Sequence, residues 1–300
     1  MINTKCAICG TNDAYEVYPE NFIASKINEE IFSARRMPDK IHYRMVRCRI
    51  CSLLYSNPIL SIKKIYSLYK KSFVTYDDHV ENLKKTYGYY LRKIDSFVPS
   101  KQRFLEIGCG NGFFLSYAKK NGYKEVWGVE PGKESVKKAP PPIRAKIVVD
   151  IFRPKQFKMD YFDVVCIFQT LDHLSKPNEV LREVYKILKP GGVFLAIQHD
   201  VSSYSAKLLG ERSPIIDIEH IYLYDSKTLR KLFLNNHYHI KDLFSVKSIH
   251  SLSYWLYLIP ISPRIKQAVI RVLGSLGIGQ IPIGVYAGNL GIIAQKPLKA

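Results

Sequence analysis

Short apolar segments alternate with helical segments from Arg103 onward, and this alternation constrains the fold more than any other feature of the sequence. Apolar periodicity predicts strands at 103–107, 125–129, 145–149, 162–168 and 193–197, and helices at 113–121, 133–138, 177–188 and 226–235. Further strands are predicted at about 238–246 and in GNLGIIAQKP, which starts at Gly288. Parallel strands joined by crossover helices produce this order. The sequence therefore predicts an α/β fold with a seven-stranded, Rossmann-like sheet.

A glycine-rich turn follows the first predicted strand. Glu106 precedes Gly108, Gly110 and Gly112, and a helix is predicted directly after them. Glycine lets the backbone approach a ligand closely, and the first turn of a helix has unpaired N–H groups. The spacing E-x-G-x-G-x-G differs from the G-x-G-x-x-G of dinucleotide-binding folds. The turn therefore predicts a ligand site at the end of this strand.

The glycine turn resembles motif I of the class I S-adenosylmethionine-dependent methyltransferases, and later segments agree with that family in order. Glu130 ends the second strand in WGVEPG, and Asp150 ends the third in VVDIF. FDVVCIFQTLDHL and LREVYKILKPGG look like the remaining signatures. The resemblance covers roughly residues 103–296 and implies that S-adenosylmethionine (SAM) is the cofactor.

The resemblance also implies roles for individual residues. Glu106 would contact the methionine amino group, Glu130 the two ribose hydroxyls and Asp150 the adenine amino group. The full set of implied cofactor-binding residues is Glu106, Gly108, Gly110, Gly112, Glu130, Pro131, Asp150, Ile151 and Gln169.

Methyl transfer to a hydroxyl or carbon acid requires removal of a proton, for which histidine is suited near neutral pH. His173, His199 and His220 follow predicted strand ends. The segment EHIY, which contains His220 and Tyr222, resembles the EH-x-x-Y-F-S stretch of sugar methyltransferases that carry an N-terminal four-cysteine zinc module. This resemblance implies His220 as the general base, with Tyr222 beside it and Tyr76 in contact with the sugar. His199 is the second candidate base, and His173 is expected to pack against the loop after the fourth strand.

That group of sugar methyltransferases differs from this sequence in one respect. Its C-methyltransferases continue into a long additional domain, whereas this sequence stops soon after the predicted seventh strand. O-methylation and C-methylation of a sugar, nucleotide-sugar or glycan precursor therefore both remain open.

The cysteines fall into two classes. Cys6 with Cys9, and Cys48 with Cys51, form two CxxC pairs, whereas the other two cysteines stand alone. In a reducing compartment, two such pairs favour a Cys₄ zinc site over disulfides. Four protein thiolates leave no open coordination position, so the expected Zn²⁺ is structural. The interval between the pairs is longer than in common zinc ribbons, so we expect an inserted segment there.

Three regions follow from these patterns. Residues 1–57 are predicted to form a zinc-ribbon-like module, 58–102 a helical lead-in with a break near Val74–Asp78, and 103–298 the methyltransferase domain. A helical insertion is expected at about 249–278. Within it, Arg264–Leu276 is amphipathic with a basic face, so it either covers the core or contacts a membrane surface through 251–276.

Charge and targeting signals bear on the partners. The net charge of +19 is spread evenly and favours anionic partners such as phosphorylated metabolites, anionic membranes or nucleic acid. Neither a signal peptide nor an apolar run of about 18 residues occurs, which predicts a cytoplasmic protein with peripheral membrane contact as an alternative.

Three functions are compatible with the sequence. The first is a small-molecule methyltransferase acting on a sugar or glycan precursor. The second is an RNA methyltransferase that grips RNA with its zinc module, although the Asn/Asp-Pro-Pro-Tyr/Phe motif of amino-methylating enzymes is absent after strand four. The third is a non-catalytic binding protein on the same scaffold.

Overall fold

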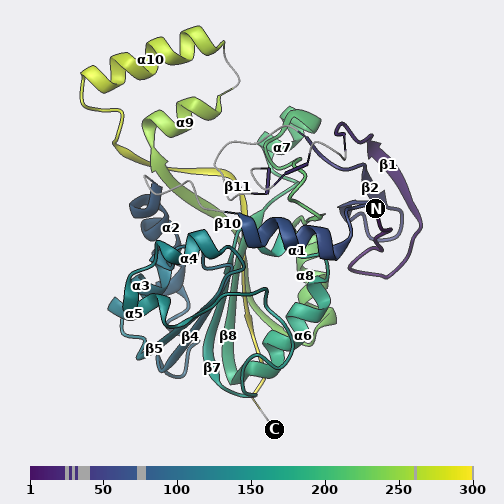
Figure 1. The fold of residues 1–300 in the computed structure, drawn as a ribbon, viewed down its shortest axis with the longest axis vertical. Coiled ribbons are helices and arrows are strands. Elements are labelled where there is room, and N and C mark those ends of the chain that lie inside the picture. The colour runs from purple at the N-terminus through teal and green to yellow at the C-terminus, as the bar shows by residue number, and fades with distance from the viewer. Residues whose placement is uncertain (24–26, 29–30, 33–40, 73–78, 260–261, 299–300) are drawn as a thin grey trace.

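The computed structural model describes residues 1–300 except 24–26, 29–30, 33–40, 73–78, 260–261 and 299–300. Within the described part, the chain forms a seven-stranded sheet covered by helices, a smaller sheet beside it, and a helical hairpin at the end of a long ribbon (Figure 1).

The large sheet has the strand order β10-β11-β8-β7-β4-β5-β6. Its strands are β4 (Arg103–Ile107), β5 (Glu125–Val129), β6 (Ile147–Val148), β7 (Phe162–Phe168), β8 (Leu188–His199), β10 (His239–Ser251) and β11 (Pro282–Gln295). The first five are joined in parallel, and β11 is antiparallel to both β8 and β10. The predicted α/β fold with a Rossmann-like sheet is confirmed.

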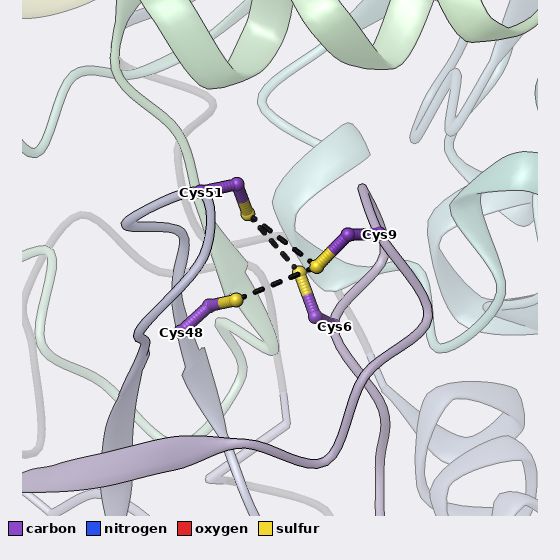
Figure 2. Close-up of side chains that lie close together, drawn as sticks. All are labelled: Cys6, Cys9, Cys48 and Cys51. Carbon is purple, nitrogen blue, oxygen red and sulfur yellow. Dashed lines mark hydrogen bonds between the residues drawn. The ribbon is translucent and has the colours of Figure 1, made fainter.

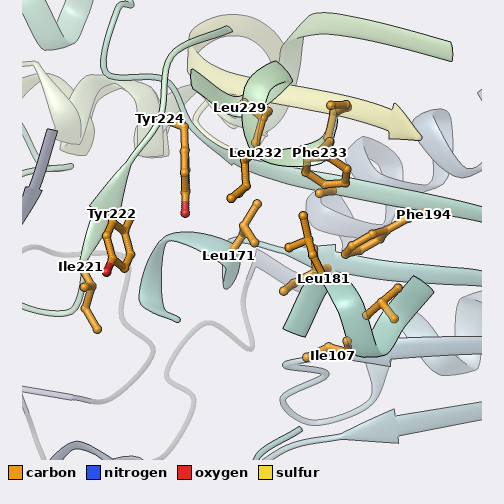
Figure 3. Packing of buried hydrophobic residues seen from close by; sticks show 14 of the residues in the cluster. Ile107, Leu171, Leu181, Phe194, Ile221, Tyr222, Tyr224, Leu229, Leu232 and Phe233 are labelled. Carbon is orange, nitrogen blue, oxygen red and sulfur yellow. The ribbon is translucent and has the colours of Figure 1, made fainter. Parts of the chain in front are cut away.

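Helices cover both faces of this sheet. They are α1 (Ile62–Lys71), α2 (Val80–Lys93), α3 (Phe113–Lys120), α4 (Lys133–Lys137), α5 (Pro141–Arg144), α6 (Pro177–Ile187), α7 (Tyr204–Leu209) and α8 (Ser226–Asn235). Alternate residues of a strand face opposite sides. Leu105 therefore joins the core beneath α1, α6 and α8, whereas Phe104 joins the core beneath α2 and α3. Figure 3 shows the first core, where Leu171 lies among Leu181 of α6 and the apolar residues of α8.

Several elements differ in extent from the sequence prediction. The third strand is shorter than 145–149 because Pro141, at the first position of α5, starts a helical turn that ends only at Ala145. The last three strands are longer than predicted, since β8 starts at Leu188 and the β10–β11 pair continues past the sheet as a two-stranded ribbon.

The small sheet joins the N-terminal region to the large domain. Its order is β1-β2-β3-β9, with β1 (Ala14–Tyr18), β2 (Met45–Cys48), β3 (Leu54–Ser56) and β9 (Tyr222–Leu223). Leu54 pairs with Leu223 and Tyr55 with Tyr222 in antiparallel register. A two-residue strand from the segment after His220 therefore completes the sheet of the expected zinc module.

The helical insertion stands away from the domain. It consists of α9 (Leu252–Leu258) and α10 (Pro263–Ser275), carried at the far end of the β10–β11 ribbon (Figure 1). Ile265, Val269, Val272 and Leu276, from the predicted apolar face, are 58%, 36%, 55% and 65% exposed. The expectation that this face covers the core is therefore wrong. Among the described residues, no helix combines the length and apolarity that crossing a bilayer requires.

Candidate active site

The glycine turn links β4 to α3 as predicted. Gly108, Gly110 and Gly112 have φ angles of 76°, 54° and 69°, which side chains with a Cβ rarely adopt. Gly108 and Gly110 line a cavity. Gly112 instead caps α3, where an added Cβ would lie 2.7 Å from Ile143 Cγ2. Gly108 and Gly110 thus border the cavity, and packing requires glycine at Gly108 as well as Gly112, because a Cβ at Gly108 would clash with the Thr170 side chain.

A buried carboxylate, Glu106, and a half-buried one, Glu130, lie beneath this turn. Glu130 Oε2 accepts a hydrogen bond from Gly110 N at 2.9 Å, and Glu130 Oε1 accepts one from Gly132 N at 2.8 Å. Glu106 is 3% exposed, and its Oε2 accepts no hydrogen bond from any described residue. Burial, together with the charge of Glu130, raises the pKa of Glu106 well above its ordinary value. Glu106 therefore offers an unused acceptor to a cationic ligand group in the cavity.

Of the residues after the third strand, those that line the cavity are not the ones that the sequence predicts. Asp150 Oδ1 accepts hydrogen bonds from Ile151 N at 2.9 Å and from Arg153 Nη2 at 2.8 Å, and Asp150 is absent from the described cavity lining. Ile151 and Phe152 line the cavity instead. Pro131 and Gln169, for which the resemblance implies a role in cofactor binding, also line it.

The cavity has a volume of about 1030 Å³, which is at the upper end of the range for ligand sites and leaves room for a cofactor beside an acceptor. Its walls come from the carboxyl ends of β4, β5, β7 and β8, where open α/β sheets bind ligands. Helix α1 closes one side through Ile65, Tyr66 and Tyr69. Apolar side chains of the lining also come from Leu208 and Leu209 of α7 and from Trp255 and Leu258 of α9, and we call these four residues the apolar end.

A histidine and an aspartate form a hydrogen-bonded pair at this edge. His199 is the last residue of β8, and its Nδ1 lies 2.6 Å from Asp172 Oδ2, in the 3₁₀ turn η3 (Leu171–His173) after β7. Burial alone would raise the pKa of Asp172, but the charge of His199 and their hydrogen bond outweigh burial and hold that pKa well below its usual range. An ionised carboxylate can only accept, so Nδ1 of His199 donates to Asp172, and in the neutral imidazole Nε2 is then the acceptor.

His220 lies against this pair. The Ile221 backbone N–H donates to Asp172 O at 2.8 Å, which fixes the segment, and the His220 and His199 ring centroids are 4.6 Å apart. His220 Nδ1 lies 2.8 Å from the Ile215 carbonyl oxygen, which can only accept, so Nδ1 donates. Burial lowers the pKa of His220, which makes it a weaker base than a solvated histidine.

The remaining predicted residues lie elsewhere. Tyr222 is buried in β9 against the N-terminal module, where its hydroxyl donates to Lys5 O at 3.0 Å and its ring stacks on Tyr55. It is not among the described cavity-lining residues. Tyr76 falls outside the described residues.

Sequence reasoning assigned no role to two residues in this cluster. Asp172 holds His199, and the Tyr69 hydroxyl lies 2.9 Å from His173 Nδ1. The sequence could have indicated a site role for Asp172, because this residue comes shortly after the strand β7 and the carboxyl ends of parallel strands meet at one edge of the sheet. Nothing local marks Tyr69, which reaches the site only because α1 crosses the cavity.

We expect the free energy of unfolding to depend on the protonation of His173. Burial lowers the pKa of His173 to about 3, against about 6.5 in an unfolded chain. Below pH ~6.5 the unfolded chain therefore binds a proton that the folded chain does not, so stability is full above that pH and falls by up to about 1.4 kcal/mol per pH unit. We expect the free energy of unfolding, measured with urea between about pH 5 and 6.5, to change less per pH unit in His173→Asn than in the wild type. Equal slopes would contradict this account.

Four cysteine side chains converge at the N-terminal module (Figure 2). The Sγ atoms of Cys6 and Cys51 are 3.3 Å apart, those of Cys9 and Cys48 3.5 Å, and those of Cys9 and Cys51 4.0 Å. Tetrahedral zinc with Zn–S bonds of about 2.3 Å separates its sulfur ligands by about 3.8 Å. The predicted ligands are thus brought together at spacings that fit Zn²⁺.

The loop with the first cysteine pair is docked on the large domain. Asn178 of α6 donates to Ala7 O at 2.6 Å, and Asn235 of α8 donates to Ile8 O at 3.0 Å. Together with the Tyr222 contact to Lys5, these bonds attach residues 5–8 to three elements of the domain. The module therefore supports the segment that places His220.

Comparisons with known proteins agree on the class of domain. A family model described as a methyltransferase domain matches residues 81–240. An uncharacterised methyltransferase of Schizosaccharomyces pombe is 31% identical over 140 residues, which are 42% of this chain and 49% of that protein. A ubiquinone biosynthesis O-methyltransferase of Psychrobacter arcticus is 28% identical over 119 residues, 36% of this chain and 46% of that protein.

A solved SAM-dependent methyltransferase from Archaeoglobus fulgidus superposes with a TM-score of 0.47 at 20% identity, covering 71% of this chain and 94% of that one. The chain spans about half the length of the curated relatives it matches.

Proposed function

Because the chain belongs to the methyltransferase domain family, we propose that it transfers a methyl group from SAM to a hydroxyl group of a small acceptor, with His199 as the general base. The hydrogen bond between Asp172 and His199, at the edge of a cavity floored by Glu106 and the glycine turn, carries this proposal.

The cofactor half of the cavity supports the proposal through its donor and acceptor groups. The unused Glu106 oxygen would receive the amino group of the methionine portion, and each Glu130 oxygen keeps a lone pair for a ribose hydroxyl. Ile151 and Phe152 would enclose the adenine, while Asp150 acts at a distance by holding Arg153. When bound, SAM supplies an electrophilic methyl group, so the protein needs mainly to position the acceptor and remove its proton.

On the acceptor side of the cavity, we assign different roles to His199 and His220. His199 Nε2 accepts the hydroxyl proton, and the Asp172 carboxylate, 2.6 Å from Nδ1, stabilises the imidazolium that forms. His220 keeps its Nδ1 proton on Ile215 and positions the acceptor through Nε2. This assignment reverses the order that the sequence favours, in which His220 is the base.

The acceptor class that we propose is a sugar or glycan precursor attached to an apolar group. The polar histidine cluster suits a hydroxylated ring, and the apolar end formed by α7 and α9 suits an attached apolar group. The resemblance of the EHIY segment to sugar methyltransferases is the basis for the sugar.

We also propose that the four-cysteine cluster binds one structural Zn²⁺. Its four thiolates would fill the coordination sphere, so the metal takes no part in the reaction. Its proposed role is to hold the loop at residues 5–8 against α6, α8 and β9.

Replacing Glu106 with glutamine should weaken SAM binding about 10-fold or more, because a hydrogen bond to a charged group contributes about 1.5–3 kcal/mol. The same change should raise the stability of the ligand-free protein, since it removes a buried carboxylate without a partner among the described residues. Titration calorimetry and thermal unfolding measure the two effects. Glu134→Gln, which removes an exposed carboxylate of α4, is the matched control. An unchanged SAM affinity would remove Glu106 from the cofactor site.

The function is tested with methyl-labelled SAM. SAM should raise the unfolding temperature, and the label should pass to a small glycan or lipid-linked glycan fraction of a cell extract. Label in RNA would support an RNA methyltransferase instead, and the absence of any thermal shift would favour a binding protein that is not a methyltransferase.

A further inference from the structure

The α9–α10 hairpin leaves an apolar stripe in solvent. Ile265, Val269, Val272 and Leu276 recur at intervals of three and four residues, so they share one side of α10, and each is at least 36% exposed. A neighbouring side of α10 is held to α9, where Lys266 Nζ donates to Tyr257 O at 2.6 Å and lies over the Tyr257 ring. The stripe is therefore the side of the hairpin that faces outward.

The charge around this stripe has a single sign. From Leu243 to Ala300 the sequence contains six Lys or Arg and no Asp or Glu. Arg264 and Arg271 lie seven residues apart on the basic face of α10, about a quarter turn around the helix from the edge of the stripe, and both are exposed. An apolar stripe flanked by cations without anions is complementary to a surface with an apolar interior and anionic head groups.

The hairpin also borders the cavity. Trp255 and Leu258 of α9 form part of the apolar end of the cavity, and Trp255 Nε1 donates to Ile283 O in β11 at 2.8 Å. Helix α9 thus contributes to the cavity lining, and α10, which carries the exposed stripe, lies next to it in the hairpin (Figure 1). An acceptor held in a bilayer would reach the cavity along α9.

We infer that the outer face of α10 docks on an anionic lipid bilayer. The apolar stripe enters the boundary between head groups and acyl chains, and Arg264 and Arg271 contact lipid phosphates. The docking itself is independent of methyl transfer; only the delivery of a lipid-borne acceptor rests on the function proposed above.

Flotation of the full chain with vesicles tests this inference, without SAM or acceptor present. The protein should float with vesicles of phosphatidylcholine containing roughly 30% phosphatidylglycerol, and far less with phosphatidylcholine alone. Replacing Arg264 and Arg271 with glutamine should weaken binding about 30-fold, since each cation near the surface contributes about a 5-fold gain in affinity. Ile265→Asp combined with Val272→Asp should abolish flotation.

A control variant and a measurement of SAM binding separate the loss of membrane docking from other effects of the substitutions. Met159, which is 71% exposed in the loop before β7, gives the control variant Met159→Asp, and this should float like the wild type. SAM-induced thermal stabilisation should be equal in all four proteins, which separates a failure of docking from a failure of the cofactor site. Absence of flotation, equal flotation with neutral vesicles, or a dimer in sedimentation that Ile265→Asp dissociates would each overturn the inference.

Discussion

Replacing His199 with asparagine should lower kcat by about 10²–10⁴-fold while leaving the affinity for SAM nearly unchanged. General base catalysis by a positioned side chain contributes a factor of this size. Asparagine can still donate to Asp172 from its amide, so the local fold is kept, but it has no nitrogen that accepts a proton at neutral pH. Single-turnover kinetics with labelled SAM, together with calorimetric binding, would separate the two quantities.

The pH dependence of the rate distinguishes a base from a merely structural residue. The asparagine variant should lose the dependence of kcat on pH that proton uptake by the general base gives the wild type. His239→Asn, an exposed histidine at the start of β10, is the matched control and should behave like the wild type. If His199→Asn keeps both full activity and the pH dependence of the wild type, His199 is not the general base and His220 becomes the leading candidate.

Replacing Cys48 with serine should cause the largest loss of stability among single substitutions in the N-terminal module. Structural zinc contributes about 10–16 kcal/mol to small metal-binding domains, so losing one of four thiolates should cost roughly 3 kcal/mol. Loss of the metal should also release the loop at residues 5–8 from Asn178, Asn235 and Tyr222, and with it the segment that places His220. Metal analysis and thermal unfolding, with and without a chelator, measure this effect.

The expected result is one zinc per chain in the wild type and a chelator-sensitive unfolding transition that the variant lacks. Cys166→Ala serves as the control, because it removes a buried sulfur of β7 that lies outside the cluster. It should lower stability but keep one zinc per chain. A wild type that contains no zinc and is insensitive to chelators would contradict the proposed metal site.

Much of the large sheet could be predicted because each of its central strands is marked by its own residues, without reference to distant parts of the sequence. Each of β4, β5 and β7 is a short apolar run with clear boundaries, and the structure reproduces those boundaries. β9 could not be predicted, since two residues show no periodicity and their partners Leu54 and Tyr55 lie far away in the sequence. The exposure of the α10 stripe was equally hidden, because an amphipathic pattern does not reveal whether a core lies beneath it.

The candidate site was predictable in composition but not in arrangement. Strand ends and the glycine turn bring Glu106, Glu130 and His199 to one edge by topology alone. Which histidine has a hydrogen-bonded carboxylate depends on the η3 turn, and no sequence pattern shows that Asp172 bonds to His199 while His220 lies close by without such a bond. The same limit applies to Asp150, whose carboxylate is engaged by an arginine three residues later.

The pairing of β3 with β9 has a consequence for the order in which the protein is made. The four cysteines leave the ribosome early, but the strand that completes their sheet, and the helices α6 and α8 that hold the first cysteine loop, are synthesised much later. At about 5–20 residues per second, this delay amounts to roughly 10–30 s. During this interval the thiols lack the protection of the finished fold. The cysteine module thus emerges before the elements that complete it, and its cysteines are most open to oxidation or to binding the wrong metal while those elements are still being translated.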